Sequence, residues 1–142
     1  MSVIRQLFLF VIVLGTDQVT KMIATTHSLW WQGAFFRLTK NEGIAFSVPL
    51  RGAFLWALLL CAIFFLAVFY MQSYRRGHML HMMSIVGIIA GGASNSIDRF
   101  RFGAVIDIFA LPGGLLFNIA DISIFIGILF LIWPNKFSPH RL

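Results

Sequence analysis

The sequence is poor in acidic residues and cysteine, and it lacks the common metal-binding motifs. Only five carboxylate side chains occur among 142 residues, against 11 lysines and arginines. The single cysteine, Cys61, excludes a disulfide framework and a Cys-x-x-Cys metal site. None of the four histidines belongs to a His-Glu-x-x-His motif, which argues against a metal hydrolase. The basic residues are scattered rather than gathered in a helical stripe, so the net charge of +6 does not indicate nucleic-acid binding.

Apolar residues, in contrast, are abundant. They make up 59% of the chain and include 16 phenylalanines, whereas soluble proteins average roughly 45–50% apolar residues. The composition therefore predicts an integral membrane protein, and the length predicts a single domain, residues 1–142.

Four segments are apolar enough to cross a membrane, for which an α-helix needs about 20 residues. We expect an all-α membrane protein with four transmembrane helices at about residues 7–24, 53–71, 80–96 and 115–133. The third segment is rich in glycine and alanine, which let helices approach closely. The first segment resembles the apolar part of a signal peptide. No small-x-small cleavage site follows it, so we interpret it as a retained span.

The distribution of basic residues favours neither orientation of the four spans. Of the 11 basic residues, five would lie on one side of the membrane and six on the other. The tight Arg75-Arg76 turn is typical of a cytoplasmic loop, and four spans place both termini on the same side.

Residues 30–49, between the first two expected spans, have the two-residue period of β-strands. Phenylalanine and leucine alternate with polar residues over 36–39, and larger apolar residues alternate with small ones over 44–48. The intervening residues 41–43, Asn-Glu-Gly, are a turn signal. We therefore expect a small β-sheet at the membrane surface in this region. Residues 100–114 are apolar but broken by glycine and proline, which predicts irregular backbone that is buried in protein or lines a wet cavity.

Two aspartates stand in apolar surroundings. Asp121 lies inside the fourth expected span, where a charged residue costs roughly 3 kcal/mol even on mild scales, so it is a candidate for function. Asp107 lies in the apolar stretch just upstream. Two carboxylates brought together in a low-dielectric site can share one proton and perform acid–base chemistry on an amide.

An Asn-x-x-Asp pattern occurs twice, as Asn95/Asp98 at the end of the third span and as Asn118/Asp121 early in the fourth. Three-residue spacing places each amide and carboxylate on one helix face, where the asparagine can donate to the carboxylate and fix its orientation. The alternative is that these polar groups only hold helices together. Two copies at adjoining helix ends, with Asp107 between them, favour a site.

Two ion pairs are also expected from the spacing of charged residues. Lys21 follows Asp17 at i,i+4 on the first span, so we expect these two to pair rather than Lys21 to act as a base. Arg99 directly follows Asp98, and a local pair there would brace the end of the third span.

Five short motifs occur in order along the chain. They are Asp17-Gln18-x-x-Lys21, Asn41-x-Gly43-x-Ala45-Phe46, Gly91-Gly92-Ala93-x-Asn95-x-Ile97-Asp98-Arg99, Gly103-x-Val105-x-Asp107 and Phe117-Asn118-x-Ala120-Asp121. Each motif is weak by itself, but the series resembles the lipoprotein signal peptidase family, signal peptidase II, over about residues 7–133.

This resemblance implies a four-span aspartic protease of the bacterial cytoplasmic (inner) membrane. Both termini would be cytoplasmic, and the active site and a small β-sheet between spans 1 and 2 would lie near the extracytoplasmic face. Asp107 and Asp121 would be the catalytic pair. The residues implied to support that pair or to bind substrate are Asn95, Asp98, Arg99, Asn118, Asn41, Asp17 and Lys21.

The implied substrate is a prolipoprotein whose cysteine carries a diacylglyceryl group, cut on the amino side of that cysteine. The lipid tails would stay among the spans while the peptide bond reaches the two aspartates. One aspartate would be ionised and take a proton from water, and the other would be protonated and polarise the scissile carbonyl. We expect contact with membrane lipids, a monomer, and no need for a metal or an organic cofactor.

The chain departs from the family pattern at three positions. Ser94 stands where glycine is usual, Ser96 stands where leucine is usual, and Ile108 separates Asp107 from the phenylalanine that usually follows it. These changes leave the acids in place and bear on helix packing and on substrate or inhibitor preference.

Two other functions fit the polar residues without the resemblance. A small proton-coupled transporter would use Asp121 as its carrier acid, but transport predicts inverted repeats, and the only repeat in the sequence is the Asn-x-x-Asp pair. A non-catalytic membrane scaffold would use the polar residues to hold helices together. Substitution of either aspartate would then harm folding rather than a reaction.

Overall fold

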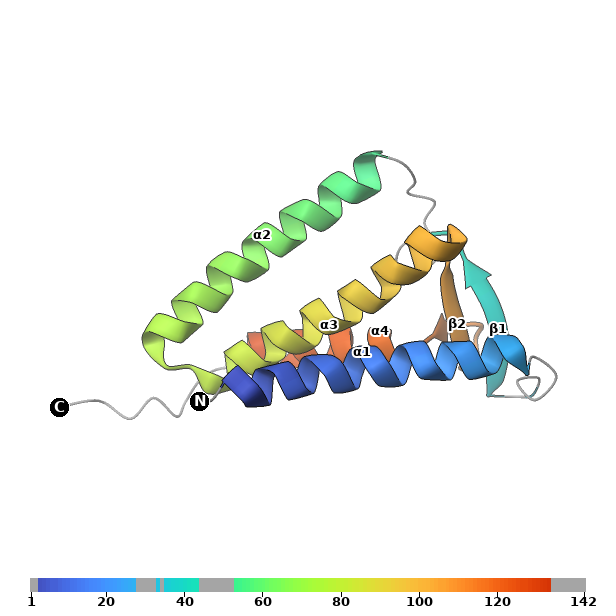
Figure 1. Ribbon diagram of the computed structural model, residues 1–142, viewed down its shortest axis with the longest axis horizontal. Coiled ribbons are helices and arrows are strands. Elements are labelled where there is room, and N and C mark those ends of the chain that lie inside the picture. Colours follow the sequence, from blue (N-terminus) through green and yellow to red (C-terminus); the bar gives the residue numbers. More distant parts are fainter. Residues whose placement is uncertain (1–2, 28–32, 34, 44–52, 134–142) are drawn as a thin grey trace.

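The computed structural model describes residues 3–27, 33, 35–43 and 53–133 as a bundle of helices with a small β-sheet at one end (Figure 1). In chain order the elements are α1 (Val3–Thr26), β1 (Phe36–Asn41), α2 (Ala53–Arg76), α3 (Met79–Phe102), β2 (Val105–Ala110), β3 (Leu116–Phe117) and α4 (Ile119–Ile132). Helix α1 begins, and α4 ends, at the end of the bundle away from the sheet.

Three helices, α1, α2 and α3, are long and apolar enough to cross a membrane. Each has 24 residues and extends beyond the expected span, because the backbone hydrogen bonds of the helix continue into polar and charged residues at its ends. Leu55 and Ser73 are the buried residues of α2, and most of its large apolar side chains are exposed. This exposure is typical of a helix that faces lipid.

Helix α4 is shorter, with 14 residues, and begins at Ile119 rather than at residue 115 as expected. The two residues before its cap form strand β3, and the side chain of Asn118 caps the helix. The sequence does not show where strand β3 ends and helix α4 begins, because the residues of both elements are equally apolar. At 1.5 Å per residue α4 is roughly 21 Å long, against roughly 30 Å for the hydrocarbon core of a bilayer.

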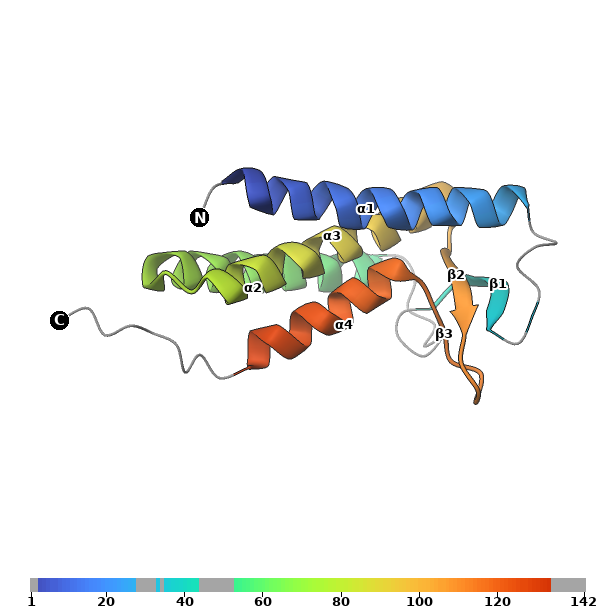
Figure 2. The ribbon, with the colours of Figure 1, turned by 90° about the horizontal axis from the view of Figure 1, so that it is seen from below.

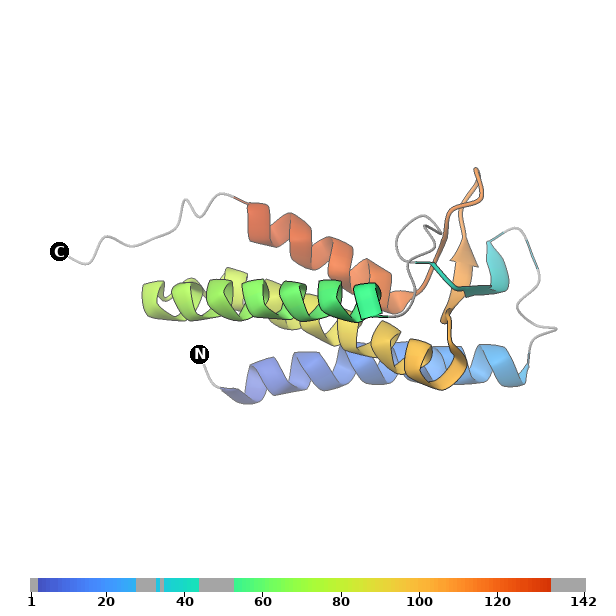
Figure 3. The same ribbon diagram turned by 90° about the horizontal axis from the view of Figure 1, so that it is seen from above.

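Helix α3 lies at the centre of the bundle, in contact with α1, α2 and α4. Figures 2 and 3 show α1 on one side of it and α4 on the other. The α3–α4 contact depends on glycine, in agreement with the small residues of the third expected span. A Cβ atom at Gly91 would lie 2.5 Å from the carbonyl oxygen of Ala120, and one at Gly127 would lie 2.8 Å from that of Ser84. Helix α2 diverges from α3 toward the sheet (Figure 1).

The sheet has three antiparallel strands in the order β1-β2-β3. Strand β1 pairs with β2 so that Asn41 lies opposite Val105 and Thr39 lies opposite Asp107. The sheet therefore takes one strand from the segment between α1 and α2 and two from the segment between α3 and α4. This corrects the expectation of a sheet confined to the region between the first two spans. Residues 44–49, part of the expected β region, lie outside the described residues.

Strand β2 replaces the irregular backbone expected between α3 and α4. Residues 104–108 are all buried, so both faces of the strand are covered. A strand covered on both faces reads as an uninterrupted apolar run rather than as an alternation, which is why the sequence pattern does not reveal it. Ile106 and Ile108 pack against Ala24, near the end of α1. The sheet thereby closes over that end of the helix and holds Asp107 inside the protein.

Candidate active site

Lys21 on α1 is the centre of a buried ion-pair cluster. Its side chain is 4% exposed, and its Nζ atom lies 2.6 Å from Oδ2 of Asp17 and 2.7 Å from Oδ2 of Asp98. Nζ also donates to Oδ1 of Asn95 at 3.0 Å, so the ammonium group has three partners for its three protons. The expected Asp17–Lys21 pair is confirmed.

The expected pair between Asp98 and Arg99 is wrong. Asp98 pairs with Lys21 across the α1–α3 contact, because consecutive residues of a helix do not face each other. The guanidinium group of Arg99 donates instead to the carbonyl oxygen of Gly43 at 3.0 Å and to that of Asn95 at 3.3 Å. Arg99 therefore holds the segment that follows β1 against α3.

We call Lys21 and its partners Asp17, Asp98 and Asn95 the lysine cluster. Its two aspartates also accept hydrogen bonds from the main chain of neighbouring elements. Asp17 accepts a hydrogen bond from the N–H of Ala120 at 2.9 Å, in the first turn of α4. Asp98 accepts one from the N–H of Ile106 at 3.1 Å, near the start of β2. The cluster thus fixes the two elements that carry the predicted catalytic residues.

Asn118 contacts both predicted catalytic residues. Its Oδ1 accepts from the N–H of Asp121 at 2.9 Å, and its own N–H donates to Oδ2 of Asp121 at 3.1 Å, which together form a capping box. Its Nδ2 donates to Oδ1 of Asp107 at 3.0 Å. The second Asn-x-x-Asp pattern is therefore a helix cap rather than a pair on one helix face.

Asp107 lies on β2 and is 1% exposed. Its carboxylate accepts hydrogen bonds from two amides, that of Asn118 and, at 3.1 Å, that of Asn41. Burial raises the pKa of Asp107 from its ordinary 3.8 to about 6; the hydrogen bond from Asn41 opposes this rise, and the charge of Asp121 adds to it. The two acids are therefore close enough to interact electrostatically.

Asp121 lies in the first turn of α4 and is half-buried. Besides the capping contact, its Oδ1 accepts a hydrogen bond from Nδ2 of Asn95 at 2.8 Å. The Oδ1 atom of Asn95 accepts in turn from Lys21 and, at 3.2 Å, from Asn118. Asn95 thus connects the lysine cluster to Asp121 and fixes the orientation of its carboxylate.

One connected network therefore contains every site residue that the sequence predicted, drawn from α1, β1, α3, β2 and α4. Within the described residues, neither Asp107 nor Asp121 forms an ion pair, whereas Asp17 and Asp98 share Lys21. The network contains two carboxylates that share Lys21 and two that are held by amides.

Gln18 and Ser94 also belong to this network, although no sequence argument assigned them a role in it. Nε2 of Gln18 donates to Oδ1 of Asp98 and to Oγ of Ser94, both at 2.9 Å, and Ser94 donates to Asp17 at 2.7 Å. Helical spacing could have found them. Gln18 lies three residues before Lys21, and Ser94 lies four residues before Asp98, so each shares a helix face with a site residue.

The chemistry that this site offers is proton transfer by carboxylates. An acid with a pKa of about 6 can both hold and release a proton near neutral pH, as general acid–base catalysis requires. In the part of the chain that the structure describes, no group of three His, Cys, Asp or Glu side chains is arranged to hold a metal ion.

The arrangement of helices and sheet is similar to that of solved membrane enzymes. One is a bacterial membrane enzyme determined by the in meso method at 2.3 Å resolution, with a TM-score of 0.76 and 26% identity over 92% of this chain and 86% of that one. A second, determined by the same method at 1.9 Å resolution, has a TM-score of 0.74 and 26% identity over 92% and 91% of the two chains. The fold is that of a bacterial membrane enzyme.

Sequence comparison shows to which family of bacterial membrane enzymes the chain is related. The chain is 36% identical to a lipoprotein signal peptidase of Syntrophus aciditrophicus over 90% of this chain and 92% of the relative. It is 35% identical to one of Moorella thermoacetica over 89% of each. The model of the signal peptidase (SPase) II family matches residues 9–136. The chain belongs to the signal peptidase II family, which confirms the resemblance of the five motifs and argues against the transporter and the scaffold.

Proposed function

We propose that the chain is an intramembrane aspartic endopeptidase whose catalytic pair is Asp107 and Asp121. The observation that carries this proposal is the position of Asn118, which donates to Asp107 and caps the helix that bears Asp121. The other two buried aspartates share the charge of Lys21 and serve to hold elements together. The proposed pair keeps its carboxylates available for proton transfer.

Catalysis begins with one proton shared between the two acids. Like charges in a buried site cannot both be present at low free energy, and the burial that raises the pKa of Asp107 to about 6 favours a shared proton near neutral pH. The ionised carboxylate takes a proton from water, and that water attacks the scissile carbonyl carbon. The protonated carboxyl polarises the carbonyl oxygen through a hydrogen bond and gives its proton to the amine nitrogen when the C–N bond breaks. The proton taken from water stays on the other carboxyl, so the pair again holds one proton.

Three asparagines orient the pair. Asn41 and Asn118 donate to Asp107, and Asn95 donates to Asp121. An amide donor fixes a carboxylate without carrying a charge, so it perturbs the proton equilibrium less than a lysine in the same place. The residues that position the elements around the pair are Asp17, Lys21, Asp98 and Arg99.

The substrate that we propose is a prolipoprotein whose cysteine carries a diacylglyceryl group, cut on the amino side of that cysteine. The relatives that are 35–36% identical are named lipoprotein signal peptidases. A lipid-bearing substrate fits a site between apolar helices and a sheet. Its acyl chains would lie along the exposed apolar side chains of the helices while the peptide bond reaches the acids on β2 and α4.

In the proposed membrane topology, α1, α2, α3 and the shorter α4 all span the bacterial cytoplasmic membrane. The start of α1, the end of α4 and the α2–α3 turn share one end of the bundle (Figure 1), and we place this end in the cytoplasm. Arg75 and Arg76 in the last turn of α2 then follow the positive-inside rule. The sheet and the catalytic pair lie near the extracytoplasmic face. We propose a monomer, because one chain completes the network.

The test is cleavage of a diacylglyceryl-modified prolipoprotein by purified protein in detergent, with signal-peptide release followed by gel shift. Asp107→Asn and Asp121→Asn should fold, as judged by thermal denaturation, and should not cleave. Ser96→Ala, which removes a hydroxyl that donates to the main chain of its own helix, should cleave as the wild type does. An inert wild type would refute the substrate assignment, and full activity of either aspartate variant would refute the catalytic pair.

A further inference from the structure

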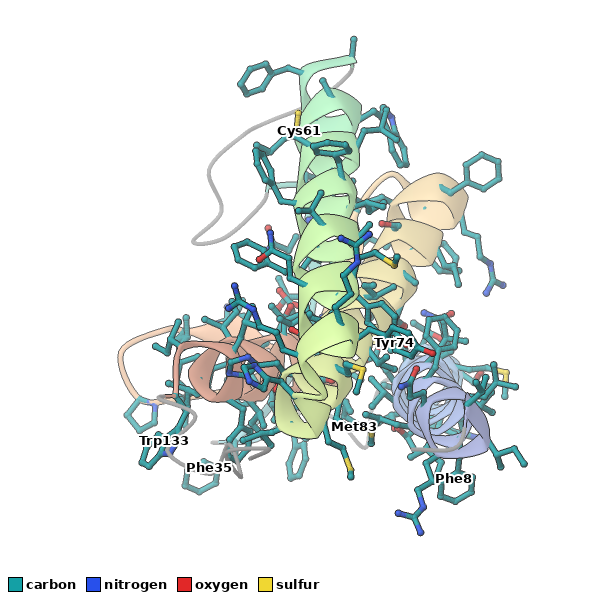
Figure 4. The ribbon with its side chains drawn as sticks, turned by 90° about the vertical axis from the view of Figure 1, so that its left-hand side faces the viewer. Phe8, Phe35, Cys61, Tyr74, Met83 and Trp133 are labelled. Atoms are coloured by element: carbon teal, nitrogen blue, oxygen red, sulfur yellow. The ribbon has the colours of Figure 1, made fainter. Side chains whose placement is uncertain are left out.

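A cavity of about 340 Å³ lies where α2, α3 and α4 meet, at the end of the bundle away from the sheet. Figure 4 shows this end, with Trp133 at the end of α4 on one side of α2 and Tyr74 on the side that faces α1. No residue of the Asp107–Asp121 network lines the cavity. The polar residues that line it are Gln72, Ser73, Arg76, His78 and His81.

The cavity wall is built by three elements. Its α2 residues occupy positions 69, 72, 73 and 76, which form one helix face. The rings of His78 and His81 lie 5.5 Å apart in an edge-to-face arrangement, and Nε2 of His81 lies 3.4 Å from the carbonyl oxygen of Trp133. The start of α3 is thereby joined to the end of α4 beside the cavity.

Ser73 is a buried polar residue whose hydroxyl has no hydrogen-bond partner among the described residues. It is 5% exposed and lines the cavity. A serine or threonine inside a helix ordinarily donates to the carbonyl oxygen four residues earlier, as Ser84 and Ser96 do. A buried hydroxyl without a partner is rare in native proteins, and this one remains able to bind a group that enters the cavity.

The other polar groups of the cavity are also hydrogen-bond donors. In the described part of the chain, the side chains of Gln72 and Arg76 have no hydrogen-bond or ion-pair partner, and no acidic residue lines the cavity. Helix α3 begins beside them, and its N-cap residue, His78, supplies no side-chain cap. The first main-chain N–H groups of a helix carry a partial positive charge. A site that is rich in donors and has no carboxylate favours an oxygen-rich anion, and a phosphate can accept two parallel N–H bonds from a guanidinium group.

Apolar residues complete the lining, namely Phe69, Leu131 and Ile132. Phe69 is 49% exposed and Ile132 is 70% exposed, so this side of the cavity opens onto the lipid-facing surface of the bundle. We propose that the cavity binds the phosphate of an anionic phospholipid headgroup, with the acyl chains along Phe69 and Ile132. A free phosphate ion would use the donors but would leave the apolar wall without a partner. The bound lipid joins α2 to the end of α4.

The test measures lipid binding to the purified full-length protein in detergent by native mass spectrometry, with phosphatidylglycerol, phosphatidylcholine and inorganic phosphate as probes. We expect phosphatidylglycerol to bind about ten-fold more tightly than zwitterionic phosphatidylcholine, and inorganic phosphate not to displace it. Equal binding of the two lipids would refute an anion-selective site. Displacement of the lipid by inorganic phosphate would show that the site takes the free ion instead.

Neighbouring arginines provide a matched control, because Arg76 lines the cavity and Arg75 does not. Arg76→Gln should weaken phosphatidylglycerol binding about ten-fold, and Arg75→Gln, which removes the same charge, should change it by less than about two-fold. Ser73→Ala should weaken phosphatidylglycerol binding about three- to ten-fold. This variant tests the proposal if Arg76→Gln does not fold. Equal losses in the two arginine variants, or unchanged binding in Ser73→Ala, would overturn the proposal.

Discussion

The side-chain amide of Asn118 lies 3.0 Å from Oδ1 of Asp107, although the asparagine caps a helix and the aspartate belongs to a strand. The same asparagine forms a capping box with Asp121. One side chain therefore sets the relative position of two carboxylates that stand on different elements. The geometry of the proposed catalytic pair depends on how helix α4 begins.

Replacing Asn118 with serine should separate its two roles. Serine is a good N-cap, so the start of α4 should be kept. The donor to Asp107 is lost, and a hydrogen bond to a charged group contributes about 1.5–3 kcal/mol, so kcat should fall about ten- to hundred-fold. Asn118→Ala loses the cap as well and should lower stability by about 1 kcal/mol more. A wild-type kcat in Asn118→Ser, measured by prolipoprotein cleavage, would show that the contact with Asp107 is dispensable.

The stability of the protein should depend on pH through Asp107. Burial raises its pKa from 3.8 to about 6, so between these values the folded state keeps a proton that the unfolded state releases. The stabilisation from this proton is complete below about pH 4 and is lost as the pH rises to about 6, a change of roughly 3 kcal/mol. Asp107→Asn cannot titrate and should lack this component. Denaturation in detergent from pH 4 to 7 measures it, and parallel curves for the two proteins would contradict the expectation.

Ser94 and Ser96 offer a comparison of two hydroxyls, one inside the network and one outside it. Ser94 donates to Asp17, whereas Ser96 donates only to the main chain of its own helix. Ser94→Ala should lower the free energy of unfolding by about 1–2 kcal/mol, because a buried carboxylate loses a donor. Ser96→Ala should change it by less than about 0.5 kcal/mol. Equal effects in chemical denaturation would mean that the Ser94 contact does not stabilise the cluster.

Gly91 and Gly92 are consecutive residues of α3, but only Gly91 lies in close contact with another helix. A Cβ atom at Gly91 would lie 2.5 Å from the carbonyl oxygen of Ala120, so alanine there must push α4 and the adjacent Asp121 away. Gly91→Ala should cost about 1–3 kcal/mol of stability and most of the activity. A Cβ atom at Gly92 meets nothing within 4 Å, so Gly92→Ala should be active and more stable by about 0.5–1 kcal/mol. Full activity in both variants, in the cleavage assay, would show that the close approach of α4 is not required.

Much of the candidate site could be predicted because a polar residue in an apolar chain is conspicuous. Asp107 and Asp121 have no reason to occur in apolar segments unless protein groups surround them, and Asn118, which is near both in sequence, bonds to both. Asn95, which the spacing paired with Asp98, donates instead to Asp121. The membrane helices were predictable because each forms a long apolar segment of the sequence. Hydropathy reports the presence of a span well, although it does not report where the helix ends.

The features that were not predictable depend on contacts between segments distant in sequence. Strand β2 has apolar residues on both faces, so its period is hidden, and its partner β1 lies far upstream. Asp98 stands next to Arg99 in sequence but pairs with Lys21, because the crossing of α1 and α3 decides which cation it meets. Local spacing carries no information about that crossing.

The hydrogen bond between Asp17 and the N–H of Ala120 links helix α1 to helix α4. During synthesis, α1 leaves the ribosome long before α4, so the lysine cluster enters the membrane without one of the groups that it later binds. We therefore expect the nascent chain to be without proteolytic activity until α4 has inserted. A chain that stops short of α4 also lacks Asp121, so it would leave no partly active peptidase in the membrane.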